Sequence, residues 1–434
     1  MRRLCVGLTA ALALIAPAIA SAEWQSQSFP DTPAYGPILA FDGRGGGVAL
    51  WERRVQVPRV LHPHHDAFIA ALGPNGRFGA PRLVGHRLFP NGLSLTSRGA
   101  DLLLATEHLR HADRIETWTG SPSRGFRRSQ VLDSAKQPFT APPLLASDER
   151  GDAVVFWSRA TRGHRRGPAM LSVRLHGGRF SRPRKIAGPG AQGLSVAMNA
   201  RSDYVLSWMR HERVEVRIGH GAVVGGLTTL ATNALSLQAS AAIDESGNVI
   251  VAWTGSAANR FATAFSYRSA GGRFGPPVMD ESGFEPVHDP IAAFAAPGEA
   301  FVAWSGSDAA GPGVFSFEVD DGTPLPPVVV APPTAGTNPY TGPELKTVAT
   351  TPGGAVLFLW TSESTHEHSV TNATLFARER FPDGTLGAVE SVGTVTAYAA
   401  EATAGIEPVS GTAVALLTEH RIPGASPFRA FVRR

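Results

Sequence analysis

The feature that most constrains this fold is a short apolar run that returns along the chain. "GNVIVAW" ends at Trp253, and a close copy, "GEAFVAW", ends at Trp304. Aligning the chain on this run gives eight copies, whose ends lie 45 to 57 residues apart. The eight runs end at Trp51, Ala105, Trp157, Trp208, Trp253, Trp304, Trp360 and Leu417. This period is close to that of a four-stranded propeller blade and longer than that of helical solenoid repeats.

Each repeat carries the signals of four strands in a constant order. A short strand such as 143–148 leads to an Asp-x-x-Gly turn (Asp148 and Gly151), in which the carboxylate caps the backbone and glycine allows the reversal. The apolar run is the second strand, and a third follows, as at 169–176. A Gly-Gly, Asn-Gly or Asp-Gly hairpin then precedes a proline-bearing outer strand. The 47 glycines and 34 prolines are typical of such a turn-rich, all-β chain.

The two ends of the repeat series indicate how the ring closes. The eighth repeat contains only three strands, and residues 23–30 have a strand-like pattern before the first complete repeat. We therefore predict one all-β propeller of eight four-stranded blades, in which the N-terminal strand completes the last blade. Seven blades is the alternative, if the short fourth repeat does not form one. The predicted blades span about 36–87, 88–136, 137–189, 190–236, 237–287, 288–341, 342–396 and 397–434 with 23–30. The recurring tryptophans are predicted to pack between neighbouring blades.

The first residues have the layout of a secretory signal peptide. Two arginines precede an apolar stretch that ends at an Ala-x-Ala site, which predicts cleavage after Ala22 and a secreted or periplasmic protein. A transmembrane anchor is the alternative, but Pro17 interrupts the run and the run is short for a span. Cys5, the only cysteine, lies in this segment, so we expect no disulfide and no thiolate chemistry in residues 23–434.

Charged residues recur two positions beyond the apolar run, where loops are expected to gather on one face of the ring. Units five and six carry glycine there, at Gly255 and Gly306. These residues are either solvated loop side chains or a ligand site, in which three arginines meet a carboxylate or sulfate. The predicted ligand-binding residues are Arg53, Glu107, Arg159, Arg210 and Glu419.

Two further patterns suggest sites. The stretch "LHPHHD" (61–66) offers His62, His64 and Asp66 as candidate metal ligands, with a polar loop as the alternative. We predict no metal and no cofactor. Arginine runs at 123–129, 161–167 and 179–185 are interpreted as solvated turns; binding of sulfated glycans, acidic lipids or nucleic acid is the alternative.

The chain resembles secreted bacterial β-propeller repeat proteins of the sialidase-like and lectin-like kind. The resemblance rests on the pattern D-x-x-G-x-x-x-x-x-W and on "GGRFSRP" (177–183) and "GGRFGPP" (271–277). It implies the propeller fold. The spacing in "SDERGDAVVFW" (147–157) differs from the sialidase Asp-box S-x-D-x-G-x-x-W, so no catalytic residue is carried over.

Two functions remain open from sequence. The first is an exported, monomeric binding module that recognises an anionic glycan or a protein partner on its loop-rich face, and not nucleic acid. The second is a carbohydrate-active enzyme, a glycosidase or lyase, which needs two carboxylates at suitable separation. Its candidate carboxylates are Glu52, Glu107, Glu212, Glu363 and Glu419.

Overall fold

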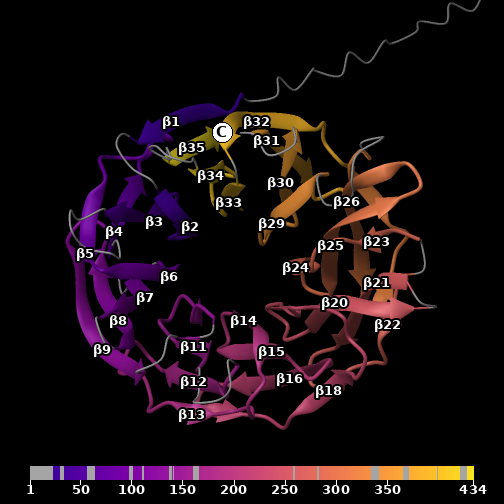
Figure 1. The fold of residues 1–434 in the computed structure, drawn as a ribbon, viewed down its shortest axis with the longest axis horizontal. Coiled ribbons are helices and arrows are strands. Elements are labelled where there is room, and N and C mark those ends of the chain that lie inside the picture. The colour runs from indigo at the N-terminus through magenta and orange to yellow at the C-terminus, as the bar shows by residue number, and fades with distance from the viewer. Residues whose placement is uncertain are drawn as a thin grey trace, which may run out of the picture.

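The eight repeats fold into eight antiparallel sheets that are arranged in a ring (Figure 1). The computed structural model describes residues 23–29, 34–55, 64–96, 101–109, 112–135, 139, 141–159, 166–257, 260–280, 283–333, 342–364, 371–397, 399–420 and 428–434. No helix in these ranges is long and apolar enough to cross a membrane. The prediction of eight blades is confirmed, and the short fourth repeat forms a complete blade.

Each blade has an innermost, a second, a third and an outermost strand, counted from the centre of the ring outward. The innermost strands are β2 (Ala34–Phe41), β6 (Leu88–Ser94), β10 (Leu144–Ser147), β14 (Gln192–Met198), β19 (Ser240–Ile243), β24 (Ile291–Ala296), β29 (Glu344–Thr350) and β33 (Ala399–Ile406). The second strands are β3 (Gly47–Val55), β7 (Asp101–His108), β11 (Ala153–Ser158), β15 (Asp203–Arg210), β20 (Val249–Ala257), β25 (Glu299–Asp308), β30 (Val356–Ser364) and β34 (Ala413–His420).

The outer half of each blade is more variable. The third strands are β4 (His64–Leu72), β8 (Asp113–Ser121), β12 (Ala169–Arg174), β16 (Arg213–His220), β21 (Arg260–Arg268), β26 (Gly311–Asp320), β31 (Thr371–Arg380) and β35 (Phe428–Arg433). The outermost strands are β5 (Arg82–His86), β9 (Gly125–Ala135), β13 (Arg184–Lys185), β17 (Val223–Val224) with β18 (Thr228–Ala231), β22 (Val278–Met279), β27 (Thr323–Pro324) with β28 (Val328–Ala331), β32 (Glu390–Ala397) and β1 (Gln25–Phe29). A short additional strand, β23 (Glu285–Pro286), pairs with β25.

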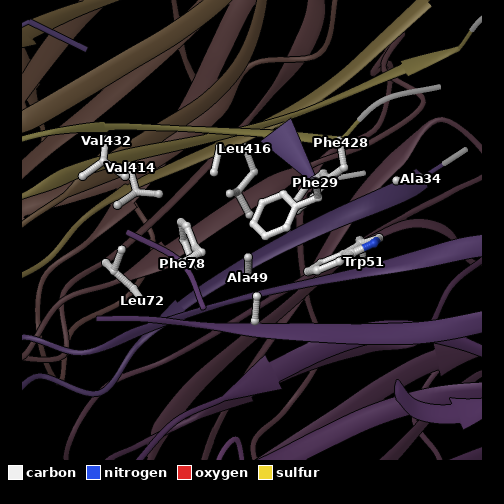
Figure 2. Close-up of a cluster of buried hydrophobic side chains, with 12 residues drawn as sticks. Phe29, Ala34, Ala49, Trp51, Leu72, Phe78, Val414, Leu416, Phe428 and Val432 are labelled. Atoms are coloured by element: carbon white, nitrogen blue, oxygen red, sulfur yellow. The ribbon is translucent and has the colours of Figure 1, made fainter. Parts of the chain in front are cut away.

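The second strands are buried on both faces, which explains their continuous apolar sequence. Their tryptophans pack against the preceding blade, as predicted: Trp208 lies with Phe156 of blade 3, and Trp51 lies with Leu416 and Phe428 of blade 8. Figure 2 shows the second of these clusters, in which Trp51, Phe29 and Phe428 lie together between the last and the first blade. The hydrophobic core is therefore a ring of inter-blade clusters.

The Asp-x-x-Gly turns join neighbouring blades as well as capping their own backbone. In blade 3, Asp148 Oδ1 accepts the N–H groups of Arg150 and Asp152, both at 2.9 Å, while Oδ2 accepts the hydroxyl of Ser202 in blade 4. In blade 5, Asp244 Oδ2 accepts the N–H of Gly298 in blade 6 at 2.8 Å. One carboxylate thus fixes a turn and an inter-blade contact.

The ring closes through β1, which pairs with β35 from Gln25–Val432 to Phe29–Phe428, as predicted. Gln27 exchanges two hydrogen bonds with the backbone of Phe78 in blade 1, at 2.7 and 2.9 Å. Gln130 on β9 makes the same pair of bonds with Phe180, at 3.0 Å each. Since Gln27 repeats the role of Gln130, β1 serves as a genuine outermost strand.

Candidate functional site

Two of the predicted loop-face arginines are held by carboxylates of the fold. In blade 4, Glu215 is 1% exposed, and both its oxygens receive hydrogen bonds from Arg210. The indole N–H of Trp208 donates to the same carboxylate at 2.7 Å. The hydrogen bond with Glu215 raises the pKa of the Arg210 guanidinium, which stays charged.

Blade 3 contains a similar arrangement with a carboxylate from the neighbouring blade. Asp133 lies on β9 of blade 2 and is buried. It accepts the indole N–H of Trp157 at 2.8 Å and forms a bidentate ion pair with Arg159. The recurrence of arginine two residues after tryptophan therefore has a structural reason, because one carboxylate serves both side chains.

The first blade departs from this arrangement. The Arg53 guanidinium lies over the ring of Phe68, 4.8 Å from its centre. Asp66, which is opposite Arg53 in the β3–β4 register, has its Oδ1 3.0 Å from Nδ1 of His86. Arg53, Arg159 and Arg210 are thus each in contact with a different local partner. Their convergence on one ligand stays a prediction.

In blade 2, the predicted residue Glu107 faces a second glutamate. Glu116 lies opposite Ala105, as Glu215 lies opposite Trp208, and Glu107 takes the place of Arg210. Burial raises the pKa of the Glu116 carboxyl, and the charge of Glu107 raises it further. Arg128 of β9 opposes this shift, with its Nη1 3.0 Å from Glu116 Oε1. Trp118, two residues beyond Glu116, fills the space beside Ala105.

Three predicted residues cannot be assigned side-chain contacts. His62 lies outside the described residues, and the side chains of His64 and Glu419 are not described either. Their backbones place His64 in β4, opposite Val55, and Glu419 in β34, opposite Ala400. Within the described part of the chain, no group of three or more His, Cys, Asp or Glu side chains is placed to hold a metal ion.

Exposed basic side chains gather on the outer edge of blades 1 to 3. They lie on the outermost strands and on the hairpins that lead into them, at the perimeter marked by β5, β9 and β13 in Figure 1. We call this set the arginine rim. It consists of Arg82, Arg124, Arg127, Arg128, Arg179, Arg182 and Lys185.

Two further arginine contacts join the edges of successive blades. Arg82 donates from Nη1 to the carbonyls of Pro122 and Ser123 in blade 2, at 3.1 and 2.6 Å. Arg184 of blade 3 donates to the carbonyl of Ala222 in blade 4 at 2.8 Å. Together with the Gln130–Phe180 hydrogen bonds between blades 2 and 3, these contacts link the outer edges of blades 1 to 4 in succession.

Acidic side chains in this region mostly point into the protein. Among the described residues from 64 to 220, only Glu149 and Glu212 are exposed acids. The buried ones include Asp133, Glu116 and Glu215, each held by an arginine. Basic groups thus dominate the surface of blades 1 to 4, although the formal charge of the whole chain is only +4.

Sequence reasoning had singled out the arginine runs but interpreted them as solvated turns. Runs 123–129 and 179–185 fall on the outer strands of adjacent blades, which brings them to one edge. The rim can therefore be identified when the order of the strands in each sheet is combined with the positions of the arginine runs in the sequence. Residues 161–165 of the third run lie outside the described residues.

Comparisons with known proteins identify the fold and no more. No family model and no curated protein matches the chain. Among solved structures, the Dos1 propeller is similar over 95% of both chains, with a TM-score of 0.51 and 9% identity. A PL25 ulvan lyase bound to -[GlcA(1-4)Rha3S]- covers 94% of this chain and 95% of its own, with a TM-score of 0.47 and 10% identity. An α-L-arabinanase from Penicillium chrysogenum, complexed with arabinobiose, covers 70% of this chain and 99% of its own, with a TM-score of 0.38 and 11% identity. The chain is a β-propeller.

Proposed function

We propose that the chain is an exported binding module that recognises an anionic glycan through the arginine rim. The observation that carries this proposal is the separation of charge in blades 1 to 4, where basic groups are exposed and carboxylates are buried. Guanidinium groups that lack exposed acidic neighbours attract anions, and their planar donors match sulfate and carboxylate groups. Export rests on the signal-peptide pattern of residues 1–22.

The extent of the rim favours a polymer over a single small anion. Its side chains come from the outer edges of three successive blades, with Arg82 bridging the first two. A chain of repeated sulfate or uronate groups can contact several blades at once, which strengthens binding without any single tight site. Nucleic acid is a weaker fit, because single strands need aromatic stacking platforms. Among the described residues, the exposed aromatic side chains are Phe261 on blade 5 and Phe381 on blade 7.

The loop-rich face is a less favoured place for the same ligand. Arg159 and Arg210, predicted to bind there with Arg53, Glu107 and Glu419, already form ion pairs with Asp133 and Glu215. An incoming anion would compete with these carboxylates and leave them buried without a counter-charge, which is costly.

Binding to dextran sulfate and to uncharged dextran tests the proposal. We expect the wild-type protein to bind only the sulfated polymer, with an affinity that falls as salt rises. The triple variant R124S/R127S/R182S should bind at least about tenfold more weakly, since three rim charges are lost. The double variant R260S/R273S, which removes exposed arginines from blade 5, is the matched control. Equal binding of uncharged dextran, or an equal loss in the control variant, would overturn the proposal.

A carbohydrate-active enzyme is the second candidate, and the Glu107–Glu116 pair favours it. Two neighbouring carboxyls, one with a raised pKa, are an arrangement found in general acid–base catalysis. Release of reducing ends from polysaccharides would be measured for the wild type and for E107Q and E116Q. Activity that vanishes in both variants would support an enzyme; activity that survives in both would exclude this pair from catalysis.

A further inference from the structure

A cavity of about 400 Å³ opens between blades 5 and 6, on the loop-rich face and away from the arginine rim. Three apolar side chains at its edge are unusually exposed for their type: Leu237 at 69%, Phe261 at 52% and Leu235 at 48%. Exposed apolar groups that gather around a hollow are typical of binding sites. We call this hollow the blade 5–6 pocket.

One wall of the pocket depends on Gly306. The strand β23 pairs with Gly306 and Ser307 of β25, and Val287 N–H donates to the carbonyl of Ser305 at 2.9 Å. A Cβ at position 306 would lie 2.8 Å from the carbonyl oxygen of Glu285, so only glycine allows the segment to come this close. This pairing fixes the segment that carries Glu285, His288 and Asp289 to the pocket.

The opposite wall is the linker between blades 4 and 5. The N–H groups of Leu235 and Ser236 both donate to the carbonyl of Thr254, at 3.0 and 3.1 Å. Burial raises the pKa of Asp289, while hydrogen bonds from Ser236 and from the backbone of Leu237 and Gln238 act against this shift. Asp289 therefore holds the linker in place, and both walls are formed before any ligand arrives.

The polar side of the pocket carries two carboxylates, with His288 beside one of them. Besides Asp289, it contains Glu285, whose side chain is 46% exposed and lies 3.9 Å from Arg260 Nε. That contact is long and solvent-exposed, so it neutralises Glu285 only weakly. A half-buried carboxylate such as that of Asp289 is stabilised when a positive charge enters beside it.

We propose that the blade 5–6 pocket binds a small ligand that joins an apolar or aromatic body to a protonated amine. The apolar body would lie against Phe261 and Leu237, and the ammonium group would lie toward Glu285 and Asp289. This chemistry is opposite in charge to that of the rim, so the two sites would take different ligands.

A series of probes that share a phenyl ring and a two-carbon linker but differ in charge tests the charge requirement. We expect calorimetric titration of the full chain to detect binding of 2-phenylethylamine and to detect at least about tenfold weaker binding of 3-phenylpropionate and 2-phenylethanol. Equal binding of the amine and the carboxylate would overturn the proposal, and so would absence of amine binding at millimolar concentration.

Variants then test the location. F261S and L237S remove exposed apolar side chains and should each weaken amine binding several-fold. E285Q removes a negative charge and should also weaken amine binding several-fold. V409S, which changes a valine of blade 8 that is also 69% exposed, is the matched control. D289N is compared only if its thermal midpoint matches that of the wild type, because Asp289 also holds the linker. E285Q and F261S change side chains that do not hold the linker, so they need no such check. Unchanged amine binding in F261S and E285Q would overturn the proposal. The rim variant R124S/R127S/R182S should bind the amine normally, so failure of one site is distinguishable from failure of the other.

Discussion

At the scale of single residues, the arginines two positions beyond Trp157 and Trp208 neutralise buried carboxylates of the fold. The pair Arg210–Glu215 in blade 4 and the pair Arg159–Asp133 between blades 2 and 3 surround indole N–H groups that need an acceptor. In blade 2 glutamate replaces the arginine, and Arg128 supplies a positive charge from another strand. These charges were recognisable in the sequence as a shared offset, but their partners were not, because Asp133 lies 26 residues from Arg159 and in another blade.

The Arg210–Glu215 pair should be important for stability. Arg210→Ala would leave Glu215, which is 1% exposed, without its counter-ion, and we expect a loss of roughly 3–5 kcal/mol in the free energy of unfolding. Arg213→Ala removes an exposed arginine from the next strand and should change stability by about 0.5 kcal/mol or less. Urea denaturation of both variants measures the difference; equal effects would show that the ion pair is not a stabilising contact.

Glu407 gives the fold a specific dependence on acid. Burial alone would raise its pKa, but hydrogen bonds from Ser410, Val409 and Gly45 lower it overall. A carboxyl whose pKa is lower in the folded than in the unfolded state contributes stability above its ordinary pKa of 4.5, and this contribution is lost as pH falls below that value.

We therefore expect Glu407→Gln to lower the thermal midpoint at pH 7 and to lower it much less at pH 3. Glu401→Gln, at an exposed position of the same blade, serves as the comparison. Thermal unfolding at several pH values provides the measurement, and a deficit in the Glu407 variant that does not shrink in acid would contradict the assigned role.

At the scale of elements, the closing strand β1 contributes a buried aromatic side chain to the contact between the first and last blades. Phe29 is 3% exposed and lies 5.1 Å from Trp51 and 5.0 Å from Phe428, measured between ring centres. The strand count alone predicted this element, since the last repeat lacked one strand. The short strand β23, and the division of the outermost strands of blades 4 and 6 into two segments, were not predicted, because these segments are short and follow no alternating pattern.

Phe29→Ala should weaken the closure strongly. Truncation of a buried aromatic side chain typically costs about 3–5 kcal/mol, and here the cavity would open between two blades. Ser28→Ala, on the exposed side of the same strand, should have little effect. Chemical denaturation of the two variants tests this, and a Phe29 variant as stable as the wild type would mean that β1 adds little to the ring.

At the scale of the whole molecule, the ring is uneven in charge. Among the described residues, most exposed basic groups lie on blades 1 to 4, whereas the exposed acids Glu245, Asp320 and Asp383 lie on the other half. The formal charge of +4 hides this separation, and composition alone cannot reveal it. The number and order of the blades could be predicted from the repeats. The direction in which each charged side chain points could not, because it depends on inter-blade contacts between residues far apart in sequence.

This uneven charge should affect the rate of binding more than the lifetime of the complex. The association rate constant with dextran sulfate is expected to fall by about tenfold or more between 20 and 200 mM salt, because long-range attraction is screened. The dissociation rate constant should change less. Surface plasmon resonance at several salt concentrations separates the two, and a salt effect confined to dissociation would argue against steering by the rim.

The pairing of β1 with β35 also sets the order in which the ring can be completed. Among the strands of the propeller, β1 comes first in the chain, yet its partner β35 comes after all the others. During synthesis, residues 25–29 must remain unpaired while the other seven blades form, and the apolar surface around Trp51 stays uncovered for the same period. Premature termination anywhere before residue 428 leaves both edges open, and open strand edges are what drives aggregation. A nascent chain of this protein is therefore most vulnerable to aggregation until β35 has been made and has paired with β1.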